Sequence, residues 1–396
     1  MNKTLQELMR TATQLTQSGR LNEATQAIQS ALRGTAAVSV APGPVNPWAD
    51  AGSYLLPGAA MQMPSPWMLD GRASKVDARK PGAPDAGGGQ FISGTHTHAA
   101  LTCHFKLYIP PGRAGKAMPL VVMLHGCTQD PDDFAAGTAM NERAREQGFF
   151  VLYPQQSPDL NPSRCWNWFE HKHQERGRGE PALIASLTQA VIQQHGIDTR
   201  RVYIAGLSAG GAMAVIVAAA YPELFAAVGV HSGLPSGAAS NVAEALMVMK
   251  SGQVGIVERA WGGRADAAAK ALLEPPMPIP TIVFHGDQDQ TVHPRNGEQV
   301  IAAALGAAAG AQDSHARPSG NARVEQGVSA QGRRYTRSTQ HGDQGQALTE
   351  HWLVHGAGHA WSGGHASGSY TDASGPDATL EMLRFFFDHP KTRGNV

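Results

Sequence analysis

This sequence has few charged residues, few cysteines and no long apolar run. Each of these features argues against one class of function or site in the protein. Charged side chains make up 16% of the 396 residues, and 32 basic residues balance 32 acidic ones without any basic block. Because nucleic-acid binding needs clustered positive charge, we expect no nucleic-acid partner. No apolar run approaches the roughly 20 residues that a bilayer span requires, so we expect no membrane-spanning helix.

The cysteines are Cys103, Cys127 and Cys165, and none of them belongs to a C-x-x-C pair. A thiolate zinc site is therefore not expected. The cysteines form either three buried thiols or one disulfide with one remaining thiol, and a disulfide would indicate an oxidising compartment. Residues 1–10 contain no apolar segment of the kind found in signal peptides, so the sequence as written predicts a cytoplasmic protein.

Apolar residues make up 42% of the chain, which is enough for a sizeable core and for one large domain with additional segments. Residues 1–35 carry apolar side chains at helical spacing, interrupted near residue 18, which predicts a helical hairpin. Residues 36–89 are rich in proline, glycine and alanine, a composition typical of linkers. Residues 90–396 form the predicted main domain, and residues 233–280 within it are expected to form a cap or pocket insertion.

The main domain alternates short apolar strands with helices. Strands are expected at 105–109, 120–124, 149–153, 202–204, 227–231, 281–285 and 352–355, and helices at 138–147, 180–195, 212–220, 242–250 and 377–389. This alternation predicts an α/β fold with a mostly parallel sheet that helices cover on both faces. Residues 334–339 are expected to pair with 350–354 as a hairpin. On the last helix, Leu380, Leu383 and Phe387 form the face that we expect to be buried.

The segment Gly206-Leu207-Ser208-Ala209-Gly210 lies between an expected strand and an expected helix, and it fits the G-x-S-x-G nucleophile elbow. The sharp turn of such an elbow exposes the serine hydroxyl, and its glycines let the strand and helix cross closely. With 45 glycines in the chain, chance matches to this pattern are expected, but Ser208 is the only serine that satisfies it. We therefore predict that Ser208 is a nucleophile.

A serine hydroxyl becomes a good nucleophile when a histidine takes its proton and a carboxylate orients that histidine. In this fold the chain order is serine, acid, histidine. Residues 284–292 run from an apolar strand into a tight turn that carries Asp287 and Asp289. By resemblance to the hydrolase pattern H-G-x-x-D-x-x-V, the downstream Val292 favours Asp289 as the acid, with Asp287 capping the turn.

His359 is the expected base, because it lies in a glycine-rich loop that follows an apolar strand. His365, in the same loop, is the alternative base. His351 and His355 precede His359 at intervals of four residues, a spacing that suits a metal site on a helix. Because residues 356–358 contain two glycines and the preceding residues form a strand, we expect no metal site there.

An oxyanion hole requires two hydrogen-bond donors. The N–H of Ala209, directly after the nucleophile, is the first expected donor, and the second should come from the loop after residues 120–124. In that loop the N–H of Cys127 is the best candidate and that of Thr128 is less favoured. Cys127 could itself act as a nucleophile, but Ser208 has the better sequence context.

Three tryptophans near the expected site are candidates for a substrate pocket. Trp166 and Trp168 lie in the loop 164–169, and Trp361 lies two residues after His359. They form either the walls of an apolar acyl pocket or ordinary packing, and the sequence favours neither.

Five ordered motifs across about residues 90–390 give the chain a specific resemblance. They are His125-Gly-Cys-Thr-Gln, Cys165-Trp-Asn-Trp-Phe, Gly206-Leu-Ser-Ala-Gly-Gly, His231-Ser-Gly-Leu-Pro and Gly356-Ala-Gly-His-Ala-Trp-Ser-Gly-Gly. With these motifs the chain resembles the polyhydroxybutyrate (PHB) depolymerase family of esterases, which includes feruloyl and acetylxylan esterase-like members.

The resemblance implies an α/β-hydrolase fold, a triad of Ser208, Asp289 and His359, and Cys127 as an oxyanion donor. It also implies a disulfide between Cys127 and Cys165. The implied activity is hydrolysis of short 3-hydroxyalkanoate esters or polyesters through an acyl-enzyme, without a metal or organic cofactor.

Carbohydrate-linked acyl esters are the alternative substrates, and a peptidase on the same fold ranks below both. A non-catalytic binding module is a competing class, which the separate acid, base and oxyanion motifs disfavour. Members of the family are often exported, so the resemblance suggests a secreted protein, whereas the sequence as written shows no signal peptide. The sequence does not predict the oligomeric state.

Overall fold

The structure is a computed structural model that describes residues 88–391 apart from 113–114, 253–278, 307–321 and 343–344. All described residues belong to the compact unit Pro64–Val396. The expected helical hairpin at 1–35 and nearly all of the expected linker at 36–89 lie outside the described residues, and they stay predictions.

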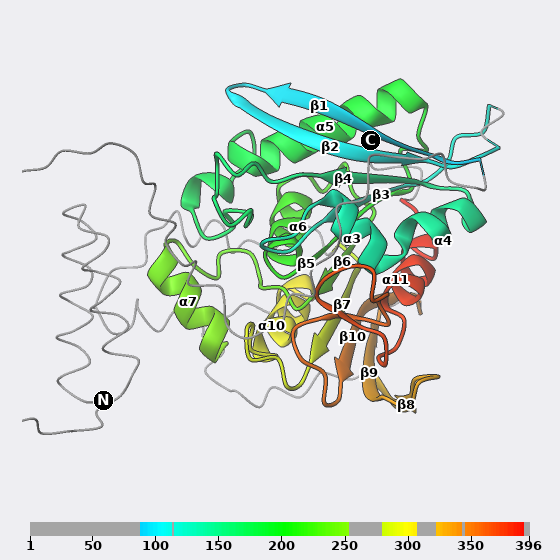
Figure 1. Cartoon of the computed structure of the whole chain (residues 1–396). Coiled ribbons are helices and arrows are strands. Elements are labelled where there is room, and N and C mark those ends of the chain that lie inside the picture. Colours follow the sequence, from blue (N-terminus) through cyan, green and yellow to red (C-terminus); the bar gives the residue numbers. More distant parts are fainter. Residues whose placement is uncertain (1–87, 113–114, 253–278, 307–321, 343–344, 392–396) are drawn as a thin grey trace, which may run out of the picture. The chain divides into compact units, whose positions relative to one another are not determined.

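A ten-stranded sheet runs through the domain in the order β1-β2-β4-β3-β5-β6-β7-β10-β9-β8 (Figure 1). The strands are β1 (Gln90–His98), β2 (Leu101–Ile109), β3 (Leu120–Leu124), β4 (Phe150–Pro154), β5 (Val202–Leu207), β6 (Ala227–His231), β7 (Thr281–Gly286), β8 (Ala322–Val328), β9 (Arg334–His341) and β10 (Ala347–Val354). From β4 to β10 the neighbours are parallel, and antiparallel strands close both edges. The expected α/β fold is confirmed, and so is the hairpin of β9 and β10.

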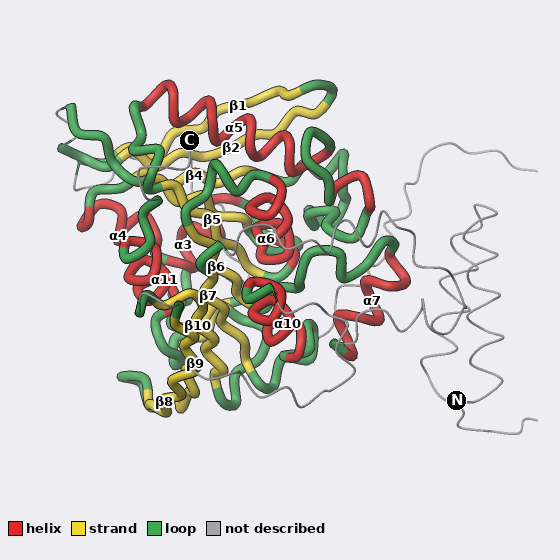
Figure 2. The backbone as a smooth tube through the Cα atoms, turned by 180° about the vertical axis from the view of Figure 1, so that it is seen from behind, coloured by secondary structure: helices red, strands yellow, loops and turns green. Residues whose placement is uncertain are grey.

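Helices cover both faces of this sheet (Figures 1 and 2). The helices are α3 (Pro131–Thr138), α4 (Met140–Gln147), α5 (Gly179–His195), α6 (Ala209–Ala220), α7 (Val242–Ser251), α10 (Arg295–Ala304) and α11 (Ala378–Phe387), with a 3-10 turn at His171–His173. Helices α5, α6 and α10 pack on one face, and α4 and α11 pack on the other. Two short strands, β11 (Trp361–Ser362) and β12 (Thr371–Asp372), pair separately.

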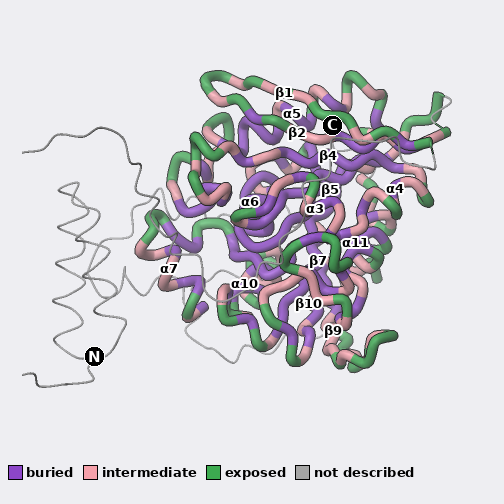
Figure 3. The backbone as a smooth tube through the Cα atoms, in the orientation of Figure 1, coloured by how far each residue is buried: buried purple, intermediate pink, exposed green. Residues whose placement is uncertain are grey.

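The central strands are buried on both faces, which explains why they are continuous apolar runs (Figure 3). In β3, for example, Val122 and Leu124 pack with the α5 and α6 side, whereas Val121 and Met123 pack with the α4 and α11 side. Side chains alternate across the sheet in this way because successive residues of a strand point to opposite faces.

Several elements differ from the expectation. The helix expected at 138–147 is α4, and the helix that precedes it, α3, was not predicted; the two meet at Ala139 with a φ of 51°. Asp130 starts α3 by accepting a hydrogen bond from the N–H of Asp133. The sequence analysis did not predict β1, β8 or α10; β1 and β8 are edge strands without an apolar run.

The expected buried face of α11 is wrong in one position. Leu380 is 42% exposed, whereas Met382, Phe385 and Phe386 join Leu383 in the core. Helical geometry explains the difference, because a residue three before Leu383 can sit at the margin of the apolar stripe that residues 382–386 define. In the expected insertion, α7 confirms the predicted helix at 242–250. None of the helices within the described ranges is long and apolar enough to cross a bilayer.

Candidate active site

Ser208 connects β5 to α6 with a φ of 58° and a ψ of −121°. A positive φ is uncommon for a residue other than glycine, and such strain concentrates at functional sites. The flanking glycines are required by close approach. A Cβ on Gly206 would meet the backbone of Gly210, and a Cβ on Gly210 would lie 2.5 Å from the carbonyl oxygen of His125. The segment therefore has the backbone of a nucleophile elbow.

Asp289 follows β7 and His359 follows β10, and these strands are parallel neighbours whose carboxyl ends meet at one edge of the sheet. His359 Nδ1 donates a hydrogen bond to Asp289 Oδ2 over 2.7 Å. The Asp289 side chain is completely buried, and its Oδ1 accepts hydrogen bonds from the N–H groups of Thr291 and Val292 at 2.9 and 2.8 Å. With Nδ1 bound in this way, Nε2 of His359 is the ring nitrogen that can accept a proton.

The charge state of Asp289 suits this arrangement. Burial by itself raises the pKa of this carboxyl, but the charge of His359 and hydrogen bonds from His285 and His359 lower it overall. The carboxylate therefore stays ionised at neutral pH. An ionised Asp289 holds the imidazole orientation, and a carboxylate in this position is able to stabilise an imidazolium.

A second Asp–His pair lies beside the first. Asp287 Oδ2 accepts a hydrogen bond from His355 Nδ1 over 2.9 Å, and its Oδ1 accepts one from the N–H of Gly356 over 2.7 Å. The Nε2 atom of His355 lies 2.9 Å from the hydroxyl of Thr336. Asp287, which we expected to cap its own turn, binds the neighbouring loop instead and fastens the two loops together.

The other histidines that the sequence singled out do not join this pair. The Nδ1 atom of His365 contacts the hydroxyl of Ser367, and the backbone N–H of His365 donates to the carbonyl of Gly137 in α3. His351 lies inside β10, and burial lowers its pKa to about 4. Within the described ranges, no group of three or more histidine, cysteine, aspartate or glutamate side chains is arranged to hold a metal ion.

The loop after β3 discriminates between the two candidates for the second oxyanion donor. The N–H of Thr128 donates to the carbonyl of Ser163 over 2.8 Å, so it is already engaged. The N–H of Gly126 donates to the side chain of Gln129 over 2.9 Å. Within the described part of the chain, the N–H of Cys127 has no acceptor. The N–H of Ala209 lies in the first turn of α6, where backbone donors have no partner within the helix. These contacts favour Cys127 and Ala209.

A disulfide between Cys127 and Cys165 fastens this loop, and Cys103 is the buried free thiol. Next to the disulfide, Trp166 Nε1 donates to the carbonyl of His125 over 3.1 Å. Burial lowers the pKa of His125 to about 4, so the ring is neutral and its Nε2 accepts the N–H of Gln156. The loop that carries Cys127 is thus held from several sides.

The three tryptophans considered for a pocket wall are packing residues in the structure. Trp166, Trp168 and Trp361 are 1%, 3% and 1% exposed. Trp361 stacks on His231 with ring centroids 5.2 Å apart, and its Nε1 donates to the hydroxyl of Thr379. Because these side chains fill the core, they have almost no surface left to offer a substrate.

His231 connects Ser208 to the loop that follows His359, a role that the sequence analysis missed. Its carbonyl accepts the N–H of Ser208 over 2.8 Å, and its Nε2 accepts the N–H of Ser362 over 2.9 Å. Burial, together with the neighbouring His285 and His359, lowers the pKa of His231 to about 3, so it adds no positive charge to the site.

Gln129 and Tyr370 are two further residues at the site to which the sequence analysis assigned no role, although Gln129 ends the motif at residues 125–129. Gln129 accepts the N–H of Gly126 and donates to Asp133 Oδ2 over 2.9 Å. The Tyr370 hydroxyl lies 3.3 Å from Thr128 Oγ1, although 242 residues separate the two in sequence. No local pattern could have predicted a contact over that separation.

Comparison with known proteins identifies the family of this chain. Residues 103–327 match the profile of the family described as Esterase PHB depolymerase, which is more than half of the chain. The chain belongs to the Esterase PHB depolymerase family. The resemblance carried by the five sequence motifs is thereby confirmed.

This family member is similar to curated esterases of several kinds. It is 36% identical over 194 residues to Poly(3-hydroxyalkanoate) depolymerase C of Paucimonas lemoignei, covering 49% of this chain and 46% of the relative. It is 32% identical over 218 residues to Acetylxylan esterase A of Talaromyces purpureogenus, covering 53% and 55%. The chain spans about half the length of the first of these relatives.

Among solved structures, the acetyl xylan esterase from Aspergillus awamori superimposes with a TM-score of 0.56 at 21% identity, covering 75% of this chain and 99% of that one. At this identity the likeness concerns the fold. It agrees with the parallel sheet and flanking helices, and the fold of this family member is that of the α/β-hydrolases.

Proposed function

We propose that this protein is a serine esterase that hydrolyses short-chain 3-hydroxyalkanoate esters or polyesters through an acyl-enzyme. The observation that carries the proposal is the 2.7 Å hydrogen bond from His359 Nδ1 to Asp289, together with the elbow conformation of Ser208. A histidine oriented in this way has Nε2 available to take the serine proton. The relatives are named as carboxylic ester hydrolases, and these names support an ester bond as the bond that is cleaved.

In the proposed reaction, Ser208 Oγ attacks the ester carbonyl carbon while its proton passes to His359 Nε2. The carbonyl electrons move to the oxygen, which the N–H groups of Cys127 and Ala209 stabilise. The ester C–O bond then breaks, and the alcohol oxygen takes the proton from His359. A water molecule attacks the acyl-enzyme with His359 again as the base, which releases the acid and restores Ser208.

The 3-hydroxyalkanoate substrate class is supported by the family and by the depolymerase relative at 36% identity. Carbohydrate-linked acyl esters are the second candidate, because Acetylxylan esterase A and Feruloyl esterase B are 32% and 31% identical relatives. Product analysis on PHB film and on acetylated or feruloylated xylan separates the two. Release of acid from xylan esters without any release from PHB would favour the second candidate.

The triad itself is tested with Ser208→Ala on p-nitrophenyl butyrate. We expect kcat to fall by about 10³- to 10⁶-fold, since the nucleophile is removed while binding groups remain. Ser240→Ala, at an exposed serine, is the matched control and should retain activity. Undiminished activity of Ser208→Ala would overturn the assignment.

The base is tested with a second matched pair. His359→Ala should lose activity to a similar extent as Ser208→Ala, because both act in the same proton transfer. His365→Ala should keep most of its activity, since His365 is bound to Ser367 and to α3. The reverse pattern would make His365 the base.

A further inference from the structure

Tyr370 is a large aromatic residue at the site that the proposed reaction does not use. Tyr370 is 42% exposed, although the neighbouring aromatic residue Trp361 is only 1% exposed. Its backbone has a φ of 52°, a conformation that is rare for residues other than glycine and asparagine. A strained, exposed aromatic residue beside a catalytic constellation is a candidate for substrate contact.

Tyr370 touches both halves of the proposed machinery. Its hydroxyl lies 3.3 Å from Thr128 Oγ1, next to the oxyanion donor Cys127. Its ring lies edge-on to His359, with ring centroids 6.5 Å apart. The reacting ester must lie between the oxyanion donors and the base, so Tyr370 borders the space that the ester occupies.

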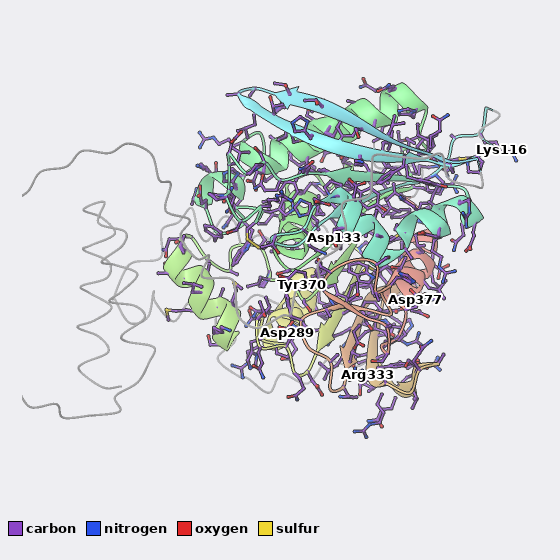
Figure 4. All side chains as sticks on the ribbon, in the orientation of Figure 1. Lys116, Asp133, Asp289, Arg333, Tyr370 and Asp377 are labelled. Carbon is purple, nitrogen blue, oxygen red and sulfur yellow. A yellow bond between two sulfur atoms is a disulfide. The ribbon has the colours of Figure 1, made fainter. Side chains whose placement is uncertain are left out.

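The structure holds Tyr370 rigidly in this place. The backbone carbonyl of Tyr370 accepts the N–H of Trp361 over 2.7 Å, which ties it to the chain just after the base. The preceding residue, Ser369, donates from its N–H and its hydroxyl to Asp133 at 2.8 and 2.5 Å. In Figure 4, Tyr370 lies between Asp133, which belongs to α3, and Asp289.

Gln129 connects the same anchor to the oxyanion loop. Its side-chain NH₂ donates to Asp133 Oδ2 and to the carbonyl of Ser369, at 2.9 and 3.2 Å, while its oxygen accepts the N–H of Gly126. The loop that carries Tyr370 also lies close to α3: a Cβ on Gly368, two residues before Tyr370, would collide with the backbone of Asp133 and Gly137. Tyr370 is therefore preorganised, and a preorganised contact costs little entropy when the substrate binds.

We propose that Tyr370 determines specificity by packing against the carbon chain of the leaving alcohol. This inference rests on the proposed esterase function. The alcohol oxygen must come within hydrogen-bond distance of His359 Nε2 to receive its proton, so the first carbons of the alcohol lie beside the neighbours of that ring. Tyr370 is a neighbour with exposed aromatic surface, which binds alkyl groups by excluding water.

The test compares two ester series by titrating released acid. One series holds the acyl group constant, as methyl and butyl butyrate, and the other holds the alcohol constant, as methyl acetate and methyl butyrate. In Tyr370→Gly we expect the preference in kcat/KM for butyl over methyl butyrate to fall about tenfold, mainly through KM, with the acyl series changing much less. Glycine suits the positive φ, so this variant removes the ring without adding strain.

Two further variants serve as controls. Tyr370→Phe keeps the ring and should keep the alcohol preference, which distinguishes packing from hydroxyl chemistry. Leu380→Ala removes an equally exposed side chain, 42%, from α11 and should leave both series unchanged.

An unchanged alcohol preference in Tyr370→Gly, no preference in the wild type, or a loss confined to the acyl series would each overturn the inference. Failure of the proposed function is distinguishable, because it would appear as ester hydrolysis that does not depend on Ser208.

Discussion

The two Asp–His pairs join the same two loops with the same chemical groups, yet they differ in burial and in what remains free. Asp289 and His359 have side chains that are 0% and 12% exposed, whereas Asp287 and His355 are 29% and 30% exposed. Hydrogen bonds to a charge are stronger where water is excluded. The buried pair therefore orients its histidine more firmly than the exposed pair does.

The second difference concerns the other ring nitrogen. His355 Nε2 lies 2.9 Å from the Thr336 hydroxyl in β9, so both nitrogens of His355 have partners. Among the residues that the structure describes, none forms a hydrogen bond with His359 Nε2, and that is the atom that a general base requires. An Asp–His hydrogen bond is thus insufficient to identify a base, and the free nitrogen distinguishes a proposed catalytic pair from a structural pair.

Among the changes that test this comparison of the two pairs, the largest effect is expected when the carboxylate of Asp289 is replaced by an amide. Asp289→Asn should lower kcat on p-nitrophenyl butyrate by about 10³- to 10⁴-fold, because the amide does not favour the required tautomer of His359. Asp287→Asn should lower kcat by less than about tenfold, since it only loosens the loop. Circular dichroism of both variants checks the fold, and equal losses of activity would contradict the comparison.

A smaller effect, on the free energy of unfolding, is expected when glycines of the two loops are replaced by alanine. A Cβ on Gly286 would lie 2.7 Å from the carbonyl oxygen of Gly358, whereas a Cβ on Gly358 would meet nothing within 4 Å. Gly286→Ala should therefore destabilise the protein by about 1–3 kcal/mol, because crowding of a packed site forces the loops apart. Gly358→Ala should stay within about 0.5 kcal/mol of wild type.

Urea unfolding measures both glycine variants without reductant, which keeps the disulfide intact. The contact between the loops would be unimportant if Gly286→Ala were as stable as wild type.

The smallest effect is a pH dependence of stability at the exposed pair. Burial by itself raises the pKa of Asp287, but the hydrogen bonds from His355 and Gly356 and the charge of His355 lower it overall. A lowered folded pKa means that the carboxylate stabilises the fold above its unfolded pKa of about 4 and that this contribution is lost as the pH falls further. The difference in unfolding free energy between wild type and Asp287→Asn should be about 1 kcal/mol or less at neutral pH.

That difference should shrink as the pH falls below the unfolded pKa, because the folded carboxyl then also takes up a proton. Urea unfolding of both proteins across this range measures it. A difference that grows on acidification would have the wrong sign for this pair.

The sequence predicted the parts of the site that depend on local backbone geometry. The elbow around Ser208 follows from G-x-S-x-G, because the two glycines are needed wherever a strand and a helix cross this closely. The loops that carry Asp289 and His359 follow from apolar strands that end in tight or glycine-rich turns. The edge strands β1 and β8 escaped prediction because they are half-exposed and lack the apolar runs that mark the central strands.

The sequence by itself determined the order of chemical groups and the local turns that present them, since both depend on neighbouring residues. Only the tertiary structure decided which aspartate meets which histidine, that Trp166, Trp168 and Trp361 are buried, and that Tyr370 lies beside His359. The physical reason is that burial and pairing arise from contacts between segments far apart in the chain. Such contacts leave no periodic signal in the sequence.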